Sequence, residues 1–224
     1  MPVKTKNITY KEPPKTITSV NELDAVYGKY SYADYLSWKI KERLELIKGK
    51  LFKMSPAPSL LHQEVSGNLF LKIGKFLEGN NCKIFSAPFD VRFPDDSKED
   101  KDVFNTVQPD ITVVCDLSKL DRRGCLGAPD LIVEILSPSS SKHDLKYKYE
   151  LYEEYGVKEY WVVHPEEQTL LIYTLDEQGK YQPGYLKTRG DIVKSTVLVG
   201  FELNLDDVFE EPDDSVPYIE NRIW

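Results

Sequence analysis

One short stretch near the middle of the chain restricts the possible fold more than any other. Residues 131–136 read Leu-Ile-Val-Glu-Ile-Leu, a nearly continuous run of branched apolar side chains. Such a run is typical of a strand that is covered on both faces. We therefore expect this strand to lie in the centre of a sheet.

Apolar periodicity predicts the elements around this strand. Helices are expected over about 31–41, 60–78 and 144–156, from helical spacing with a serine cap at the first and glycine stops at the other two. Alternating patterns and turn residues predict a hairpin around Lys48-Gly49 and further strands at 82–86, 89–93, 109–115, 160–163 and 170–173. This order predicts an α/β (α+β) fold with an N-terminal β-hairpin.

Length and charge limit the function classes. The 224 residues suit a polar leader at 1–30, one domain at 31–210 and an acidic tail at 211–224. No apolar run is long enough for a membrane span or a signal peptide, so we expect a soluble, cytoplasmic protein. The formal charge of −8 argues against a surface that binds nucleic acid everywhere, although it allows a local basic groove.

The cysteines and histidines restrict the metal chemistry. Cys82, Cys115 and Cys125 are odd in number and not closely spaced, so they support neither a disulfide framework nor a cysteine zinc site. We expect them to be buried or free thiols in a reducing compartment. With three histidines in the chain, any metal would be a hard cation that oxygen ligands hold.

Glu134 is the first candidate site residue. A carboxylate inside an apolar strand costs several kcal/mol unless a cation or hydrogen bonds compensate it. If strand 109–115 pairs with strand 131–136, Asp110 and Glu134 can meet at one edge of the sheet. Two such oxygen donors would suit Mg²⁺ or Mn²⁺. The alternative is that Glu134 forms a buried salt bridge and that Asp110 only follows a proline at a strand start.

Lys148 is the second candidate. On a helical wheel of 145–155, one arc is apolar, and Lys148 is the only charged side chain on it; the members of this arc are Leu145, Tyr149, Leu151, Tyr152 and Tyr155. The helix would therefore direct an ammonium group back at the sheet, near the two carboxylates. An ammonium group and a metal ion together supply what phosphodiester hydrolysis needs. The alternative is a lysine that covers apolar surface with its aliphatic stem.

At these residues the sequence resembles a known group. Pro109-Asp110 followed by Glu134-Ile135-Leu136 resembles the signature of the PD-(D/E)XK nuclease superfamily, except that Leu136 stands where a lysine is expected. A wider set of segments resembles the bacterial Uma-two family of restriction endonucleases within that superfamily: 45–51, His62-Gln63, Pro109-Asp110, 129–139, Asp144 with Lys148 and Tyr152, and 156–163. That family commonly lacks the strand lysine and offers one from the next helix, a place that Lys148 matches.

The resemblance covers about residues 31–210 and implies a fold and an activity. The implied fold is restriction-endonuclease-like, a central mixed sheet flanked by helices. The implied protein is a metal-dependent endonuclease, often a homodimer, that leaves a 5′-phosphate and a 3′-hydroxyl. The sequence departs from the family at His164-Pro165, where an aspartate often follows the Tyr-Trp strand. We expect this departure to affect a turn and to leave the site intact.

Two further matched positions carry open alternatives. Glu45, on the hairpin, either completes the acidic cluster or is a surface carboxylate. His62, at the start of the long helix, could contact a phosphate or a carboxylate, or could serve only for capping or packing.

The resulting hypothesis is a Mg²⁺-dependent (or Mn²⁺-dependent) endonuclease. Asp110 and Glu134 would bind the metal, with the carbonyl of Ile135 and water, and Lys148 would act on the attacking water or on the developing charge. Removal of Lys148 is expected to leave the fold intact. Nucleic acid, with DNA the expected form, would bind weakly and with strong salt dependence, helped by a small basic rim; its members would be Arg92, Lys119, Arg122 and Arg123. The alternatives are a catalytically silent module for protein association and a metal-dependent hydrolase of a small phosphoester.

Overall fold

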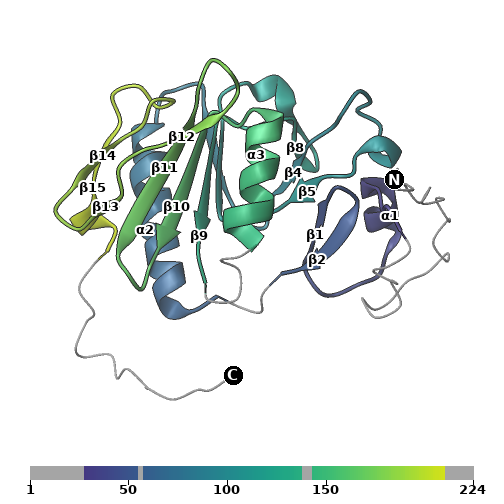
Figure 1. The fold of residues 1–224 in the computed structure, drawn as a ribbon, viewed down its shortest axis with the longest axis horizontal. Coiled ribbons are helices and arrows are strands. Elements are labelled where there is room, and N and C mark those ends of the chain that lie inside the picture. Colours follow the sequence, from purple (N-terminus) through teal and green to yellow (C-terminus); the bar gives the residue numbers. More distant parts are fainter. Residues whose placement is uncertain (1–27, 55–57, 138–142, 210–224) are drawn as a thin grey trace, which may run out of the picture.

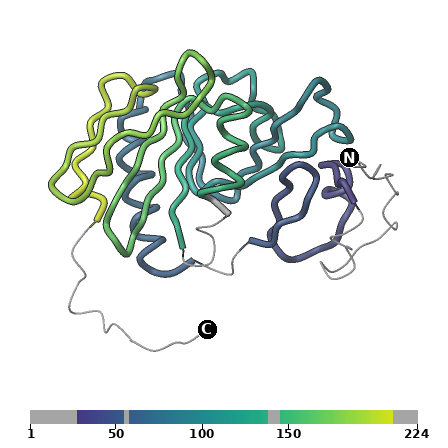
Figure 2. The backbone as a smooth tube through the Cα atoms, viewed as in Figure 1, coloured from purple at the N-terminus to yellow at the C-terminus, as the bar shows by residue number. Residues whose placement is uncertain are grey.

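The computed structural model describes residues 28–54, 58–137 and 143–209, in which two mixed sheets and three α-helices form an α+β fold (Figures 1 and 2). The predicted α+β class is therefore confirmed. The expected leader falls mostly on residues 1–27 and the expected tail on 211–224, which lie outside the described residues. None of the described helices is long and apolar enough to cross a membrane.

The larger sheet holds the strand that the sequence places at the centre. Its strand order is β12 (Tyr181–Pro183), β11 (Thr169–Leu175), β10 (Glu159–His164), β9 (Leu131–Ile135), β6 (Ile111–Val114) and β3 (Lys83–Ser86), with β13 (Lys187–Thr188) also paired to β11. All five residues of β9 are buried. Strand β9 runs parallel to β10 and antiparallel to β6, so the sheet is mixed and the central position of β9 is confirmed.

The smaller sheet begins with the predicted hairpin. Its order is β2 (Lys50–Lys53), β1 (Leu44–Ile47), β5 (Thr106–Val107), β4 (Asp90–Arg92), β8 (Gly124–Leu126) and β7 (Leu120–Asp121). Lys48 and Gly49 both have positive φ, as a two-residue hairpin turn of the I′ type requires. A separate pair, β14 (Ile192–Lys194) with β15 (Glu202–Asn204), follows near the end of the described chain.

Strand alternation gives β9 two different apolar surroundings. Leu131, Val133 and Ile135 pack with the buried face of α2 (Leu60–Phe76), whereas Ile132 and Leu136 pack with α3 (Tyr149–Tyr155). Helices α2 and α3 therefore cover opposite faces of the larger sheet (Figure 1). Helix α1 (Tyr32–Ser37) begins with a capping box between Ser31 and Asp34. Three short 3-10 helices and one π-helical segment complete the described elements: η2 (Asp100–Asp102), η3 (Leu117–Lys119) and η5 (Leu205–Asp207), and the π-helical η4 (His143–Lys148).

The helix before α3 differs from the sequence-based expectation. Residues His143–Lys148 form a π-helical segment, and regular α-helix starts only at Tyr149. A π-turn takes more residues than an α-turn, so a wheel drawn at 100° per residue places the first positions wrongly. Leu145, predicted on the buried arc, is 41% exposed, whereas Tyr152 and Leu151 are buried as predicted.

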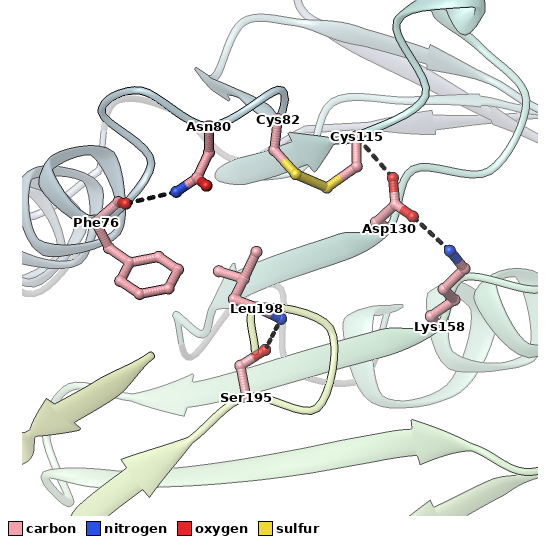
Figure 3. Close-up of a disulfide and its surroundings, with 8 residues drawn as sticks. All are labelled: Phe76, Asn80, Cys82, Cys115, Asp130, Lys158, Ser195 and Leu198. Carbon is pink, nitrogen blue, oxygen red and sulfur yellow. Dashed lines mark hydrogen bonds and ion pairs between the residues drawn. A yellow bond between two sulfur atoms is a disulfide. The ribbon is translucent and has the colours of Figure 1, made fainter. Parts of the chain in front are cut away.

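The expectation for the cysteines was wrong in part. Cys82 and Cys115 form a disulfide with a Cα–Cα distance of 3.9 Å (Figure 3). Lys83 pairs with Val114 in the antiparallel β3–β6 ladder, and one further step of the same register brings the two cysteines opposite each other. Their separation of 33 residues hides this contact in the sequence. Cys125 is free and buried, and burial raises the pKa of its thiol to about 12, so it is not a reactive nucleophile.

One glycine of the smaller sheet gives a test of the fold. Gly124 has φ +133°, and a Cβ atom there would lie 2.2 Å from the backbone oxygen of Asp90 on the paired strand β4. We expect Gly124→Ala to lower the free energy of unfolding by roughly 2–4 kcal/mol, because it adds backbone strain and a clash. Gly67→Ala is the matched control: Gly67 lies on α2 with open space around it, and the change should stabilise the protein by about 0.5–1 kcal/mol. Denaturant unfolding measures both changes, and equal stability of Gly124→Ala and wild type would contradict this close approach of β4 and β8.

Candidate active site

A buried lysine joins two glutamates from different sheets. Lys148 Nζ lies 2.9 Å from Glu134 Oε1 and 3.0 Å from Glu45 Oε1. All three residues are at most 3% exposed. Two carboxylates and one ammonium carry a net charge of −1 when all are ionised. Burial of such groups costs free energy unless they are paired, so the contacts of Lys148 with the two glutamates offset part of this cost.

Each member of the cluster comes from a separate element. Glu134 is on β9 of the larger sheet, Glu45 is on β1 of the smaller sheet, and Lys148 is the last residue of the π-helical segment before α3. The backbone N–H of Gln108 also donates to Glu45 Oε1, at 3.0 Å. The suggestion that Glu45 is a surface carboxylate is therefore wrong, because this side chain is buried in the cluster.

Asp110 lies beside the cluster, at the point where strand β6 begins. The β6–β9 register pairs Ile111 with Val133, and one more step brings Asp110 opposite Glu134. Asp110 Oδ2 accepts a hydrogen bond of 2.8 Å from the backbone N–H of Ile135, the residue after Glu134. The side chain of Asp110 is 23% exposed, whereas that of Glu134 is 4% exposed. Asp110 is thus the more accessible of the two acids from neighbouring strands.

His62 reaches the same carboxylate from helix α2. Its Nε2 lies 3.5 Å from Asp110 Oδ2, and its backbone N–H donates to the side chain of Ser59, the N-cap of the helix. Burial lowers the pKa of His62, but the hydrogen bond and the charge of Asp110 outweigh burial, so that the pKa is raised overall. Within the described chain, the buried Nδ1 atom of His62 has no hydrogen-bond partner. Of the options left open by the sequence, the contact with a carboxylate is present.

Tyr152 is a member of the cluster to which the sequence analysis gave no role. Its hydroxyl donates to Glu134 Oε1 at 2.6 Å, the same oxygen that Lys148 contacts. Burial raises the pKa of Tyr152 well above its ordinary value, and the charge of Glu134 raises it further, so the phenol stays a neutral donor. The available signal was its position four residues after Lys148, on the same helical face.

Removal of this hydroxyl should weaken the cluster without disrupting the packing of the ring. We expect Tyr152→Phe to lower the free energy of unfolding by roughly 1.5–3 kcal/mol, the range for a hydrogen bond to a charged group. Tyr173→Phe is the matched control, since Tyr173 stacks on Tyr160 in the same aromatic cluster and has no part in the Glu134 contacts described above. Urea unfolding of both variants measures the difference. Equal losses for the two would show that the Tyr152 bond to Glu134 adds nothing specific.

The oxygen donors at this edge of the sheet suit a hard divalent cation. Mg²⁺ is usually held by one or two carboxylates together with water, and backbone carbonyls are compatible ligands. Asp110, Glu134 and the carbonyl of Ile135 are donors of this type. Within residues 28–54, 58–137 and 143–209, no group of three or more His, Cys, Asp or Glu side chains is arranged to hold a metal ion. A cation at this edge would therefore depend on water for most of its ligands.

The basic rim expected from the sequence is largely engaged within the protein. Arg92 is 1% exposed and forms an ion pair of 2.5 Å with Asp121. Arg123 pairs with Asp100, and Lys119 Nζ donates to the carbonyl of Ala128 at 2.8 Å. The expectation was therefore wrong for Arg92, because its side chain is buried; for Lys119 and the exposed Arg122 and Arg123 it stays a prediction.

The described chain thus combines a mixed sheet, with helices on both faces, and a buried acid–lysine cluster where the central strand β9 ends. A family model with the description "Putative restriction endonuclease" (Uma2) matches residues 32–206, so the chain belongs to this family. The predicted resemblance is confirmed. The fold is also similar to the crystal structure of a protein from Anabaena variabilis ATCC 29413 that is titled a putative nuclease of DUF820, with a TM-score of 0.60 and 20% identity; 80% of this chain and 97% of that one are covered.

A curated relative is an uncharacterized protein of Synechocystis sp. (strain ATCC 27184 / PCC 6803 / Kazusa). The two are 28% identical over 130 residues, which is 57% of this chain. The match spans 64% of the relative's own length.

Proposed function

We propose that this chain is a Mg²⁺-dependent endonuclease that hydrolyses phosphodiester bonds in nucleic acid and acts as a homodimer. Membership of the family whose model carries the description "Putative restriction endonuclease" supports the reaction class. One observation carries the assignment of the site: the ammonium of Lys148 lies at Glu134, and Asp110 is hydrogen-bonded to the residue after Glu134. Two acids and one amine are thus gathered at one edge of the sheet.

The exposure and contacts of each residue suggest its role in the reaction. Asp110 and Glu134 would hold the metal ion, which when bound polarises a phosphate and lowers the pKa of water. Lys148, which contacts two carboxylates, would orient the attacking water or stabilise negative charge on the phosphate oxygens. Glu45 also contacts the Lys148 ammonium, and the Tyr152 hydroxyl donates to the Glu134 carboxylate.

The test is cleavage of supercoiled plasmid and of single-stranded DNA at low salt, with Mg²⁺ or Mn²⁺, by wild type and by Asp110→Asn. We expect metal-dependent nicking by wild type only, leaving 5′-phosphate and 3′-hydroxyl ends. Equal residual cleavage by both proteins would indicate a contaminant and would overturn the proposal. Cleavage of a model phosphodiester, with none of DNA or RNA, would indicate a small phosphoester as the substrate instead.

A catalytically silent module is the second candidate, and the same ion pair favours it. A lysine between two buried glutamates can serve purely to hold β1, β9 and α3 together. The two candidates differ in metal response. If Mn²⁺ raises the melting temperature of wild type and not that of Asp110→Asn, the site binds metal; equal behaviour of both would favour the silent module.

A further inference from the structure

Two aromatic rings lie beside the cluster, at the boundary with solvent. Phe52, on β2, and Tyr147, in the π-helical segment, have ring centroids 5.3 Å apart at an angle of 39°. Tyr147 directly precedes Lys148 and is 36% exposed. Phe52 pairs with Glu45 in the β1–β2 register, so the two side chains share one face of the hairpin. Both rings are therefore neighbours of residues that form the cluster.

Cationic side chains accompany this ring pair. Lys146 Nζ lies 5.8 Å from the centroid of the Tyr147 ring, within the range of a cation–π contact, and Lys146 is exposed. Lys50 is also exposed and lies two residues before Phe52 on the same strand, hence on the same face of the hairpin. Aromatic rings beside lysines are the combination that proteins use to bind single-stranded nucleic acid, where rings stack on bases and cations follow the phosphates.

The charge of the whole protein makes stacking important. The formal charge is −8 and Arg92, one residue of the expected basic rim, is buried, so binding through phosphate contacts alone is disfavoured. Stacking on a base needs no positive charge, but it needs a base that has left its own stack. A duplex does not present such a base without an energetic cost.

We infer that Phe52 and Tyr147 form a binding subsite for an unstacked nucleobase, and hence that the substrate of the proposed nuclease is single-stranded nucleic acid. This inference rests on the proposed function, since a substrate can be assigned only if the chain is a nuclease. Binding to the ring pair is nevertheless measurable without cleavage. Tyr147 directly precedes Lys148, so the subsite adjoins the cluster along the chain.

The experiment measures fluorescence anisotropy of labelled oligothymidylate in EDTA, so that no metal supports cleavage. The proteins are wild type, Tyr147→Ala, Tyr147→Trp and, as control, Tyr185→Ala, since Tyr185 is 91% exposed and lies outside the ring pair, between β12 and β13. We expect wild type to bind the single strand more tightly than a duplex of equal length. Tyr147→Ala should weaken this binding roughly 5- to 100-fold, and an abasic oligomer should bind wild type with a similar loss.

The remaining variants complete the test. Tyr147→Trp should keep the wild-type affinity, because an indole also stacks, and Tyr185→Ala should be unchanged. Absence of binding by wild type, tighter binding of duplex, or equal affinities of Tyr147→Ala and Tyr185→Ala would each overturn the inference. Cleavage assays of the same proteins with Mn²⁺ separate the two proposals. Base-dependent binding without cleavage would contradict the proposed nuclease activity and support the base subsite. Cleavage that is unaffected by Tyr147→Ala would support the nuclease activity and contradict the subsite.

Discussion

Replacement of Lys148 by methionine should lower the free energy of unfolding by about 3–5 kcal/mol and, in the nuclease account, lower the cleavage rate roughly 10²- to 10³-fold. Methionine fills similar volume but leaves Glu134 and Glu45 without the ammonium that lies within 3.0 Å of both. This differs from the expectation from sequence alone, in which the fold survives unchanged. The loss of stability is expected because Lys148 and both glutamates are buried, so that the glutamates would keep uncompensated charges.

Lys158→Met is the matched control for this prediction. Lys158 also makes a short ion pair, 2.7 Å from Asp130 Oδ1, but its side chain is 65% exposed (Figure 3). Asp130 is buried, but solvent reaches the ammonium of Lys158 and Asp130 keeps the hydrogen bond from the N–H of Cys115, so we expect a smaller loss than for Lys148→Met, about 1–2 kcal/mol, and unchanged cleavage. Denaturant unfolding gives the stabilities, and initial rates are measured at a temperature where both variants stay folded. A Lys148→Met protein as stable as wild type would contradict a stabilising contact of Lys148 with the two glutamates. A destabilised but fully active variant would show that Lys148 has a structural role and no catalytic one.

Replacement of Asp110 by asparagine should abolish metal-dependent cleavage while the fold is retained. The amide can still accept the hydrogen bond from the N–H of Ile135, but it no longer carries the charge that a divalent cation needs. For wild type, Mn²⁺ at about a hundred times its dissociation constant should add about 2.7 kcal/mol to the free energy of unfolding. For Asp110→Asn this increment should disappear.

Asp207→Asn provides the comparison for Asp110. Asp207 pairs with Lys72 at 2.7 Å, half-exposed, and it contributes nothing to the acid–lysine cluster. This variant should keep the Mn²⁺ increment and the cleavage rate of wild type. If calorimetric unfolding shows the same increment for Asp110→Asn and Asp207→Asn, the metal binds elsewhere and the assigned ligands are wrong.

Local patterns were enough to predict much of the fold. The apolar run at 131–136 identified the buried central strand β9, and Lys48-Gly49 identified the hairpin turn. The same local reasoning located a buried charge at Glu134 and a lysine directed toward it. In each case the determining signal lay within a few consecutive residues or one helical turn.

Contacts between distant segments could not be derived in this way. The depth of Glu45 depends on how the smaller sheet packs against α3, and the pairing of Cys82 with Cys115 depends on the β3–β6 register. The π-helical segment, in which Leu145 is exposed, deviates from regular α-helix geometry. A helical wheel with the fixed angle per residue of an α-helix does not describe it. The roles of Asp110, Glu134 and Lys148 in chemistry stay a prediction.

Crystals of wild type soaked in Mn²⁺ and measured for anomalous scattering would test the central claim most directly. The account predicts a peak within coordination distance of carboxylate oxygens of Asp110 and Glu134, and its loss in Asp110→Asn. A peak at another acidic surface, or none at a Mn²⁺ concentration that supports cleavage, would contradict the proposed metal site.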